Sequence, residues 1–211
     1  MKVQNSMLCP EFYARDALIV AKALLGQWIQ HREVTLRITE TEAYCGPQDS
    51  ACHARCGKTR RNAAMWGPAG CAYVYLCYGL HHMLNVVTGQ EGVPEAVLIR
   101  ACEVVQGLAV VRGRRRGLQG PTLLTGPGKV GQALQLDCSF SHQKLFEQGG
   151  LVVRRGENVR DILVGPRVGI SYAQKAHREA LWRFAVANSP WVSQRHMLRP
   201  LQAAASSLWR C

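Results

Sequence analysis

Apolar and polar positions alternate most clearly between residues 34 and 44, and this alternation predicts a β-strand. Successive side chains of a strand point to opposite faces. One face of this strand would carry Leu36, Ile38, Glu40, Glu42 and Tyr44. That face begins apolar and should point inward, yet two carboxylates follow on it. Burying a carboxylate without partners is costly, so the pattern predicts a charged partner for these acids inside the fold.

The same kind of pattern predicts the neighbouring elements. Apolar residues at helical spacing predict a helix over 14–25, which Gly26 would end. Residues 27–31 predict a strand that pairs with residues 34–44 through a turn at 32–33.

Residues 71–87 predict a hairpin that turns at Tyr78 and Gly79. Its first strand is apolar on both faces, so we expect that strand at the centre of the sheet. The remaining predicted elements are strands over 96–102, 151–155 and 162–170, and helices over 104–116 and 130–136.

These elements mix without regular strand–helix–strand units, which is typical of an α+β fold. We expect a single mixed domain with a curved, mostly antiparallel sheet, flanking helices and a protruding β-hairpin. A chain of 211 residues fits one large domain, which we place at residues 1–195. Residues 196–211 are expected to form a C-terminal tail.

The charge balance is strongly basic, with 26 Lys and Arg against 14 Asp and Glu and a formal net charge of +12. Such an excess indicates a polyanionic partner, either nucleic acid or an anionic membrane surface, although a basic surface can also serve solubility alone. Residues 63–90 carry no Asp, Glu, Lys or Arg, but Gly-Pro, Gly and Asn interrupt them. A buried hairpin therefore fits this segment better than a membrane span.

Nine cysteines raise the question of metal binding, and the nearest group is Cys45, Cys52, His53 and Cys56. The spacing of this group does not match a zinc knuckle, and no second close pair follows at finger distance. We therefore predict reduced thiols that pack as small apolar side chains, and no bound metal.

Arg100 closes an otherwise apolar strand and is the candidate partner of the two inward acids. One interpretation is a structural buried ion pair. The alternative is a general base, in which a carboxylate kept ionised by Arg100 holds an attacking water. Glu42 lies nearer to the strand end and to the basic segment 45–70, so Glu40 is the structural candidate and Glu42 the catalytic one.

Aromatic residues give a second indication of a binding site. Tyr44, Tyr73 and Tyr75 could stack on a planar ligand, although core packing is the alternative for each of them. Tyr78 is expected at an exposed turn, where it could act as a wedge between stacked bases. Lys129, in the run TGPGK, could contact a DNA phosphate; residues 112 and 114–116 could do so or form a solvated face.

Several runs together resemble one family, from about Glu11 to Ser193. They are ITETEAYCGPQDSACHA, RRN at 60–62, parts of AYVYLCYGLHHMLNV, LIRA, TGPGKVGQAL and ANSPWVS. The chain resembles the alkyladenine (methylpurine) DNA glycosylases. The resemblance implies a base-flipping, monofunctional glycosylase without metal or cofactor. Its substrates would be alkylated and deaminated purines such as 3-methyladenine, 7-methylguanine, hypoxanthine and ethenoadenine.

The resemblance also implies roles at matching positions. Glu42 would activate the water, helped by Arg100 and the main-chain carbonyl of Val168. Substrate contacts would come from Tyr44, His53, Tyr75, Asn85 and Leu98, with Asn85 disfavouring the amino group of normal guanine. Tyr78 would fill the gap left in the duplex, and the other DNA contacts would be Leu80, Met83, Arg61, Asn62 and Lys129.

Two rival functions are distinguishable from the sequence. A zinc nucleobase deaminase needs H-x-E and P-C-x-x-C, but His53 is followed by Ala-Arg and no P-C-x-x-C occurs here. A non-catalytic damaged-DNA-binding module would explain the charge and Tyr78 but leaves Glu42 with a structural role only. We therefore expect a monomeric enzyme that acts on double-stranded DNA with damaged purines, inside the cell with the DNA.

Overall fold

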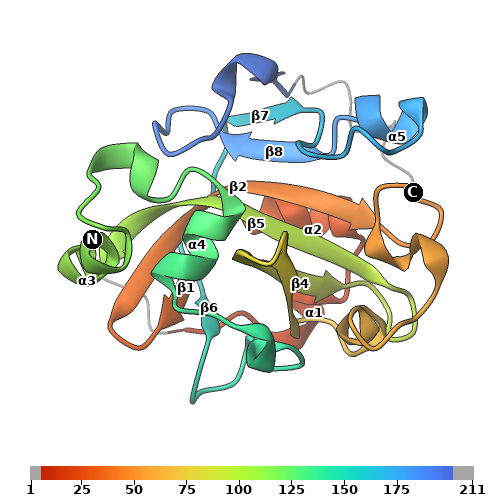
Figure 1. The fold of residues 1–211 in the computed structure, drawn as a ribbon, viewed down its shortest axis with the longest axis horizontal. Coiled ribbons are helices and arrows are strands. Elements are labelled where there is room, and N and C mark those ends of the chain that lie inside the picture. Colours follow the sequence, from red (N-terminus) through yellow and green to blue (C-terminus); the bar gives the residue numbers. More distant parts are fainter. Residues whose placement is uncertain (1–5, 202–211) are drawn as a thin grey trace.

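The structure, a computed structural model, describes residues 6–201. Within these residues nine strands form one sheet in which all neighbours pair antiparallel, and five α-helices flank it (Figure 1). This arrangement confirms the predicted single α+β domain. The strands are β1 (Trp28–His31), β2 (Val34–Cys45), β3 (Ala72–Cys77), β4 (His81–Thr88), β5 (Glu95–Gln106), β6 (Val152–Arg154), β7 (Ile162–Gly165), β8 (Arg183–Val186) and β9 (Arg199–Pro200). The helices are α1 (Pro10–Tyr13), α2 (Ala17–Ala23), α3 (Leu108–Arg114), α4 (Pro127–Ala133) and α5 (Lys175–Glu179).

The strand order is β3-β4-β5-β2-β8-β7-β9, with β1 paired to both β2 and β6. The long strands β2 and β5 form the centre. Ile38 pairs with Cys102 and Glu42 pairs with Leu98, while two register shifts between these pairs cancel each other. The alternation of β2 therefore keeps its phase through the shifts, as the sequence predicts. Both faces of β2 are covered, since Leu36, Ile38, Thr39, Glu40, Thr41, Glu42 and Ala43 are all buried.

The predicted helix over 14–25 is shorter in the structure, where α2 begins at Ala17. Asp16 caps it by accepting hydrogen bonds from the backbone N–H groups of Leu18 and Ile19. The helix packs on β2, where the Thr41 hydroxyl donates to the carbonyl of Ala21 over 2.8 Å. In Figure 1, α2 lies behind the central strands and α4 in front of them. The two helices therefore cover opposite faces of the sheet.

β3 lies at one end of the strand order, so the prediction that it is central is wrong. Ala72, Tyr73 and Val74 are nevertheless buried, because the segment 138–145 covers this edge of the sheet. The backbone N–H of Ala72 donates to the carbonyl of Gln143, and that of Val74 donates to the Ser141 hydroxyl over 3.0 Å. A covered edge strand thus has the same apolar pattern as a central one.

Two further boundaries differ from the prediction. β5 continues to Gln106, so the helix expected from 104 begins only at Leu108, after Gly107 at a φ of 83°. The strand expected over 162–170 ends at Gly165. In the predicted tail, residues 199–200 form β9 on β7, and residues 202–211 lie outside the described residues.

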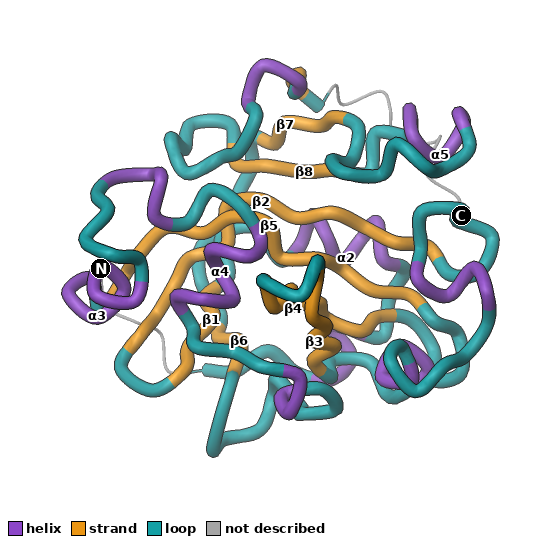
Figure 2. The backbone as a smooth tube through the Cα atoms, in the orientation of Figure 1, coloured by secondary structure: helices purple, strands orange, loops and turns teal. Residues whose placement is uncertain are grey.

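Helix α4 approaches the β3–β4 hairpin closely. A Cβ on Gly131 would clash with the backbone carbonyl of His82, so the sequence needs a glycine at this contact. Figure 2 shows that the segment from 46 to 70 is mainly loop, with short helical turns over His53–Cys56 and Ala63–Trp66. Within the described residues, no helix is long and apolar enough to cross a membrane.

Candidate active site

Glu42 lies near the end of β2 and is fully buried. The backbone N–H of Val168 donates to its Oε1 over 2.7 Å, and the Tyr44 hydroxyl donates to its Oε2 over 3.0 Å. Nη1 of Arg100 lies 3.3 Å from Oε1. Donors of this kind stabilise the ionised form of a carboxylate that has lost its hydration. Three separate segments of the chain therefore hold one buried charge in place.

Glu40, the other inward acid, is occupied by internal contacts. Its Oε1 accepts from Nε of Arg100 over 3.0 Å, and Oε2 accepts from the backbone N–H of Ser193 over 2.7 Å. The Ser193 hydroxyl donates to Oε1 over 2.9 Å, and Arg183 lies 3.4 Å away. Glu40 thus ties β2 to the segment after β8, which fits its predicted structural role.

The sheet itself directs Arg100 towards both acids. Glu40 pairs with Ala101 and Thr41 pairs with Ile99, which leaves Arg100 as an extra residue in the β2–β5 ladder. Burial alone would lower the pKa of Arg100, but Glu42 and Glu40 outweigh burial and raise that pKa. The predicted ion pair is present, and it joins one guanidinium to two carboxylates.

A cavity of about 490 Å³ opens beside this network. Tyr44, Arg100 and Val168 line it, whereas Glu42 has no exposed surface and lies directly behind these three partners. The volume is in the range of small-ligand pockets and is sufficient for a single nucleobase. The other predicted substrate contacts, His53, Tyr75, Asn85 and Leu98, also line the cavity. The structure therefore brings the predicted catalytic and substrate residues together.

An aromatic cluster forms one side of the cavity. His53 Nδ1 lies 2.8 Å from the Tyr73 hydroxyl, and the His53 ring meets the edge of Tyr75 with centroids 4.5 Å apart. Burial, together with the positive charges of Arg61 and Arg55, lowers the pKa of His53 to about 4. His53 is consequently a neutral imidazole at neutral pH, held by a tyrosine.

Asn85 and Leu98 lie opposite each other on β4 and β5. The Asn85 amide donates to the carbonyl of Tyr73 over 3.0 Å and is only 4% exposed. This contact fixes the orientation of the amide, because both groups are part of the β3–β4 hairpin. Asn85 thus presents a fixed polar group in an otherwise largely apolar wall.

The hairpin turn and the cavity rim carry most of the predicted DNA contacts. Tyr78 is 88% exposed and Leu80 77% exposed, which is unusual for side chains of their size. Met83 and Arg61 line the cavity, and the Arg61 guanidinium lies 5.5 Å from the centre of the Tyr75 ring. Apolar tips beside a cation are suited to contact with stacked bases and phosphates.

Two predicted DNA contacts have different surroundings. Asn62 is 4% exposed, and its amide donates to the carbonyls of His53 and Gly57. It therefore braces the loop that carries His53, and its contact with DNA stays a prediction. Lys129 is half-buried on α4, whose first residue, Pro127, lines the cavity.

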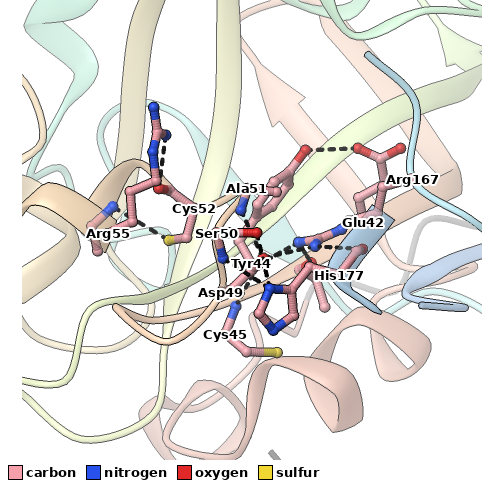
Figure 3. A network of polar contacts seen from close by, with 12 residues as sticks. Glu42, Tyr44, Cys45, Asp49, Ser50, Ala51, Cys52, Arg55, Arg167 and His177 are labelled. Atoms are coloured by element: carbon pink, nitrogen blue, oxygen red, sulfur yellow. Dashed lines mark hydrogen bonds and ion pairs between the residues drawn. The ribbon is translucent and has the colours of Figure 1, made fainter. Parts of the chain in front are cut away.

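The sequence analysis did not identify Asp49 and Arg167, which pair beside the cavity. Figure 3 shows Arg167 among Tyr44, Asp49 and His177. Asp49 belongs to the family-like run after Tyr44, which was a usable signal. The sequence around Arg167 contains no comparable signal, because its partner Asp49 lies 118 positions away. Tyr73, one of the three tyrosines predicted to stack on a planar ligand, also lines the cavity.

No group of three or more potential metal ligands occurs in the part of the chain that the structure describes. In the candidate metal group, Cys52 accepts a hydrogen bond from the backbone N–H of Ala54, and burial raises its pKa to about 11. His53 is engaged with Tyr73. The surroundings of both residues suit a neutral thiol and a neutral imidazole.

A buried carboxylate beside a base-sized aromatic cavity, on a strongly basic protein, is typical of DNA glycosylases. The family model described as methylpurine-DNA glycosylase matches residues 11–190, so the chain belongs to the methylpurine-DNA glycosylase family. It is a hydrolase of DNA repair that acts on alkylated bases in damaged DNA.

Similar proteins occur in bacteria and in a plant. A protein of Nitrosococcus oceani, provisionally named a 3-methyladenine DNA glycosylase, is 59% identical over 94% of this chain and 98% of its own length. The DNA-3-methyladenine glycosylase of Arabidopsis thaliana is 54% identical over 94% of this chain and 79% of its own length. A Corynebacterium glutamicum protein with the same provisional name is 46% identical over 88% of this chain and 96% of its own length.

Proposed function

We propose that this enzyme flips a damaged purine out of duplex DNA into the cavity and hydrolyses its N-glycosidic bond with a water that Glu42 activates. The observation that carries this proposal is the position of Glu42, held directly behind the cavity wall by three residues that line it, Tyr44, Arg100 and Val168. An acid with only a structural role would also need hydrogen-bond or ion-pair partners. Those partners would not all have to line a cavity of this size.

Charge development explains why a carboxylate is needed. A purine that leaves C1′ of deoxyribose passes through an oxocarbenium-like transition state. The negative charge of Glu42 stabilises this cation and also accepts the proton of the attacking water. The 3.3 Å contact with Arg100 is the longest of the three, so we infer that the water enters there, with the Val168 main chain helping to hold it.

Tyr44, His53 and Tyr75 would enclose the flipped base. Alkylation at a ring nitrogen makes a purine cationic, which improves it as a leaving group and favours contact with tyrosine faces. Asn85, beside Leu98, would disfavour the exocyclic amino group of normal guanine. The substrates we propose are 3-methyladenine, as the names of the relatives state for those proteins, together with 7-methylguanine, hypoxanthine and ethenoadenine.

Tyr78 and Leu80 would fill the space that the flipped nucleotide leaves in the duplex. Met83 would contact the neighbouring base, while Arg61 and Lys129 would contact the DNA backbone. The net charge of +12 supports salt-sensitive scanning along DNA. We propose that the enzyme acts as a monomer on DNA inside the cell and needs no metal or cofactor.

The proposed reaction leaves an abasic site and an intact strand. Strand cleavage by a glycosylase requires an amine that forms a Schiff base with the sugar. Among the described residues, 6–201, none of those that line the cavity is a lysine. The enzyme is therefore proposed to be monofunctional.

The test is to identify the bases released by the purified protein from methylated DNA and from duplexes with one defined lesion. Free 3-methyladenine and 7-methylguanine are expected by chromatography, with strand breaks only after alkali. Tight binding of lesion duplexes without base release would instead support a damaged-DNA-binding module.

A further inference from the structure

We propose that Arg167 is a positioning residue that sets the orientation of Glu42 through both of its carboxylate oxygens. The inference rests on the proposed function, because it assigns Glu42 as the base. Arg167 makes no direct contact with Glu42 and acts through its neighbours.

Arg167 is buried, and both of its Nη atoms donate hydrogen bonds. Its Nη2 donates to Oδ1 of Asp49 over 2.8 Å, and its Nη1 contacts the other oxygen, so the two side chains pair bidentately. Both side chains of this pair have no exposed surface. The guanidinium lies 4.7 Å from the ring centres of both Tyr44 and Trp182. A planar cation held between two rings and a carboxylate has little freedom to move.

Arg167 is connected to Glu42 through two neighbouring residues, Val168 and Tyr44. The next residue along the chain is Val168, whose backbone N–H donates to Oε1 over 2.7 Å. On the other side, Arg167 lies against the ring of Tyr44, whose hydroxyl donates to Oε2 over 3.0 Å. Figure 3 shows this arrangement, with Arg167 close to Tyr44 and a dashed line from the tyrosine hydroxyl to Glu42. The Arg167 guanidinium thus positions the hydrogen-bond donors of both Glu42 oxygens, which are the Val168 N–H and the Tyr44 hydroxyl.

The pair also orders chain segments next to the cavity, whose lining includes Ala51 and Val168. Asp49 accepts from the backbone N–H groups of Cys45 and Ala51, so it orders the loop after β2. Arg167 donates to the carbonyls of Ala43 and His177, which joins this loop to α5. Loosening the pair would therefore disturb the residues around Glu42 without removing any group that touches the substrate.

The alternative is an ordinary buried ion pair that contributes only to stability. Arg167→Lys separates the two interpretations. Lysine keeps the positive charge but cannot donate hydrogen bonds to two carboxylate oxygens and two carbonyls at the same time. Asp49→Asn removes the charge partner and leaves Arg167 in place. Arg37→Lys is the matched control, because Arg37 also pairs with two carboxylates, Glu103 and Glu157, but does not line the cavity.

The experiment measures single-turnover release of hypoxanthine from a duplex with one hypoxanthine, at saturating enzyme. Misplaced catalytic groups cost up to about 100-fold, so we expect Arg167→Lys and Asp49→Asn to slow release about 10- to 100-fold. Affinity for the same duplex should change less than about threefold, because no DNA-contacting group is removed.

Wild-type release rates in both folded variants would overturn the inference, as would equal slowing by Arg37→Lys. If one of the two variants does not fold, the other decides. A wild-type enzyme that releases no base would overturn the proposed function instead, and with it this inference.

Discussion

The backbone N–H of Val168 donates to Oε1 of Glu42 over 2.7 Å, and the two residues are 126 positions apart in the chain. The contact joins the end of β2 to the loop after β7. A backbone donor cannot be replaced by a rotamer change, so the carboxylate has one orientation in which all its partners are satisfied. That orientation places it at the wall of the cavity.

Replacing Arg100 with Ala should reduce both stability and activity. The change leaves Glu40 and Glu42 buried with one cation fewer, and breaking a buried pair in this way costs about 3–5 kcal/mol. Urea unfolding should show the loss as a lower midpoint with an unchanged slope. Lys144→Ala, which breaks an exposed pair with Glu147, is the control and should leave the midpoint unchanged. Equal midpoints for Arg100→Ala and wild type would contradict the buried-pair account.

His53 should remain neutral through the physiological range. Its pKa is lowered from 6.5 to about 4, so NMR of the imidazole should show no titration between pH 8 and 5. The unfolded chain takes up the proton first as the pH falls. Wild type should therefore be more stable than His53→Gln above pH 6.5, and this advantage should shrink as the pH falls towards 4. An imidazole that titrates near 6.5 would show that burial does not act on His53.

Tyr78→Ser should weaken lesion binding without destabilising the protein, because the ring is 88% exposed. Stacking of one aromatic on a base is worth about 1–3 kcal/mol, so the Kd for a lesion duplex should rise about 5- to 150-fold. Leu108→Ser provides the control, since Leu108 is an exposed apolar residue on α3 that does not line the cavity. If the Kd rises no more for Tyr78→Ser than for Leu108→Ser, Tyr78 does not act as a wedge between stacked bases.

Lys129→Ala should reduce the salt dependence of DNA binding. Each phosphate contact contributes about one unit to the slope of log K against log salt, so that slope should fall by about 1. Base-release rates at saturation should stay at the wild-type level. Lys144→Ala again serves as the comparison, because Lys144 pairs with Glu147. An unchanged slope would place Lys129 outside the DNA interface.

Local patterns were sufficient to predict much of the central sheet. The alternation in residues 34–44 and the turn at 32–33 give β1 and β2 nearly at their observed bounds. The position of β3 was not predictable, because burial by the segment 138–145 and burial at the sheet centre leave the same apolar pattern. The start of α3 was predicted too early in the chain, because β5 extends to Gln106.

The site was predictable where a residue's neighbours lie close in sequence or carry a recognisable motif. Glu42, Tyr44 and Arg100 follow from an inward acid, an adjacent aromatic and an arginine at the end of an apolar strand. Arg167 could not be found in this way, since its pairing with Asp49 depends on how distant segments pack. Asn62 was assigned to DNA from the resemblance, whereas the loop uses its amide internally.

Glu42→Gln tests the central claim most directly. Glutamine keeps the size of the side chain but removes the charge and the base, so single-turnover release of hypoxanthine from a saturated duplex should fall by about 100-fold or more. Affinity for the same duplex should stay within a fewfold of the wild-type value. Release at the wild-type rate by a correctly folded Glu42→Gln enzyme would show that this carboxylate does not activate the water.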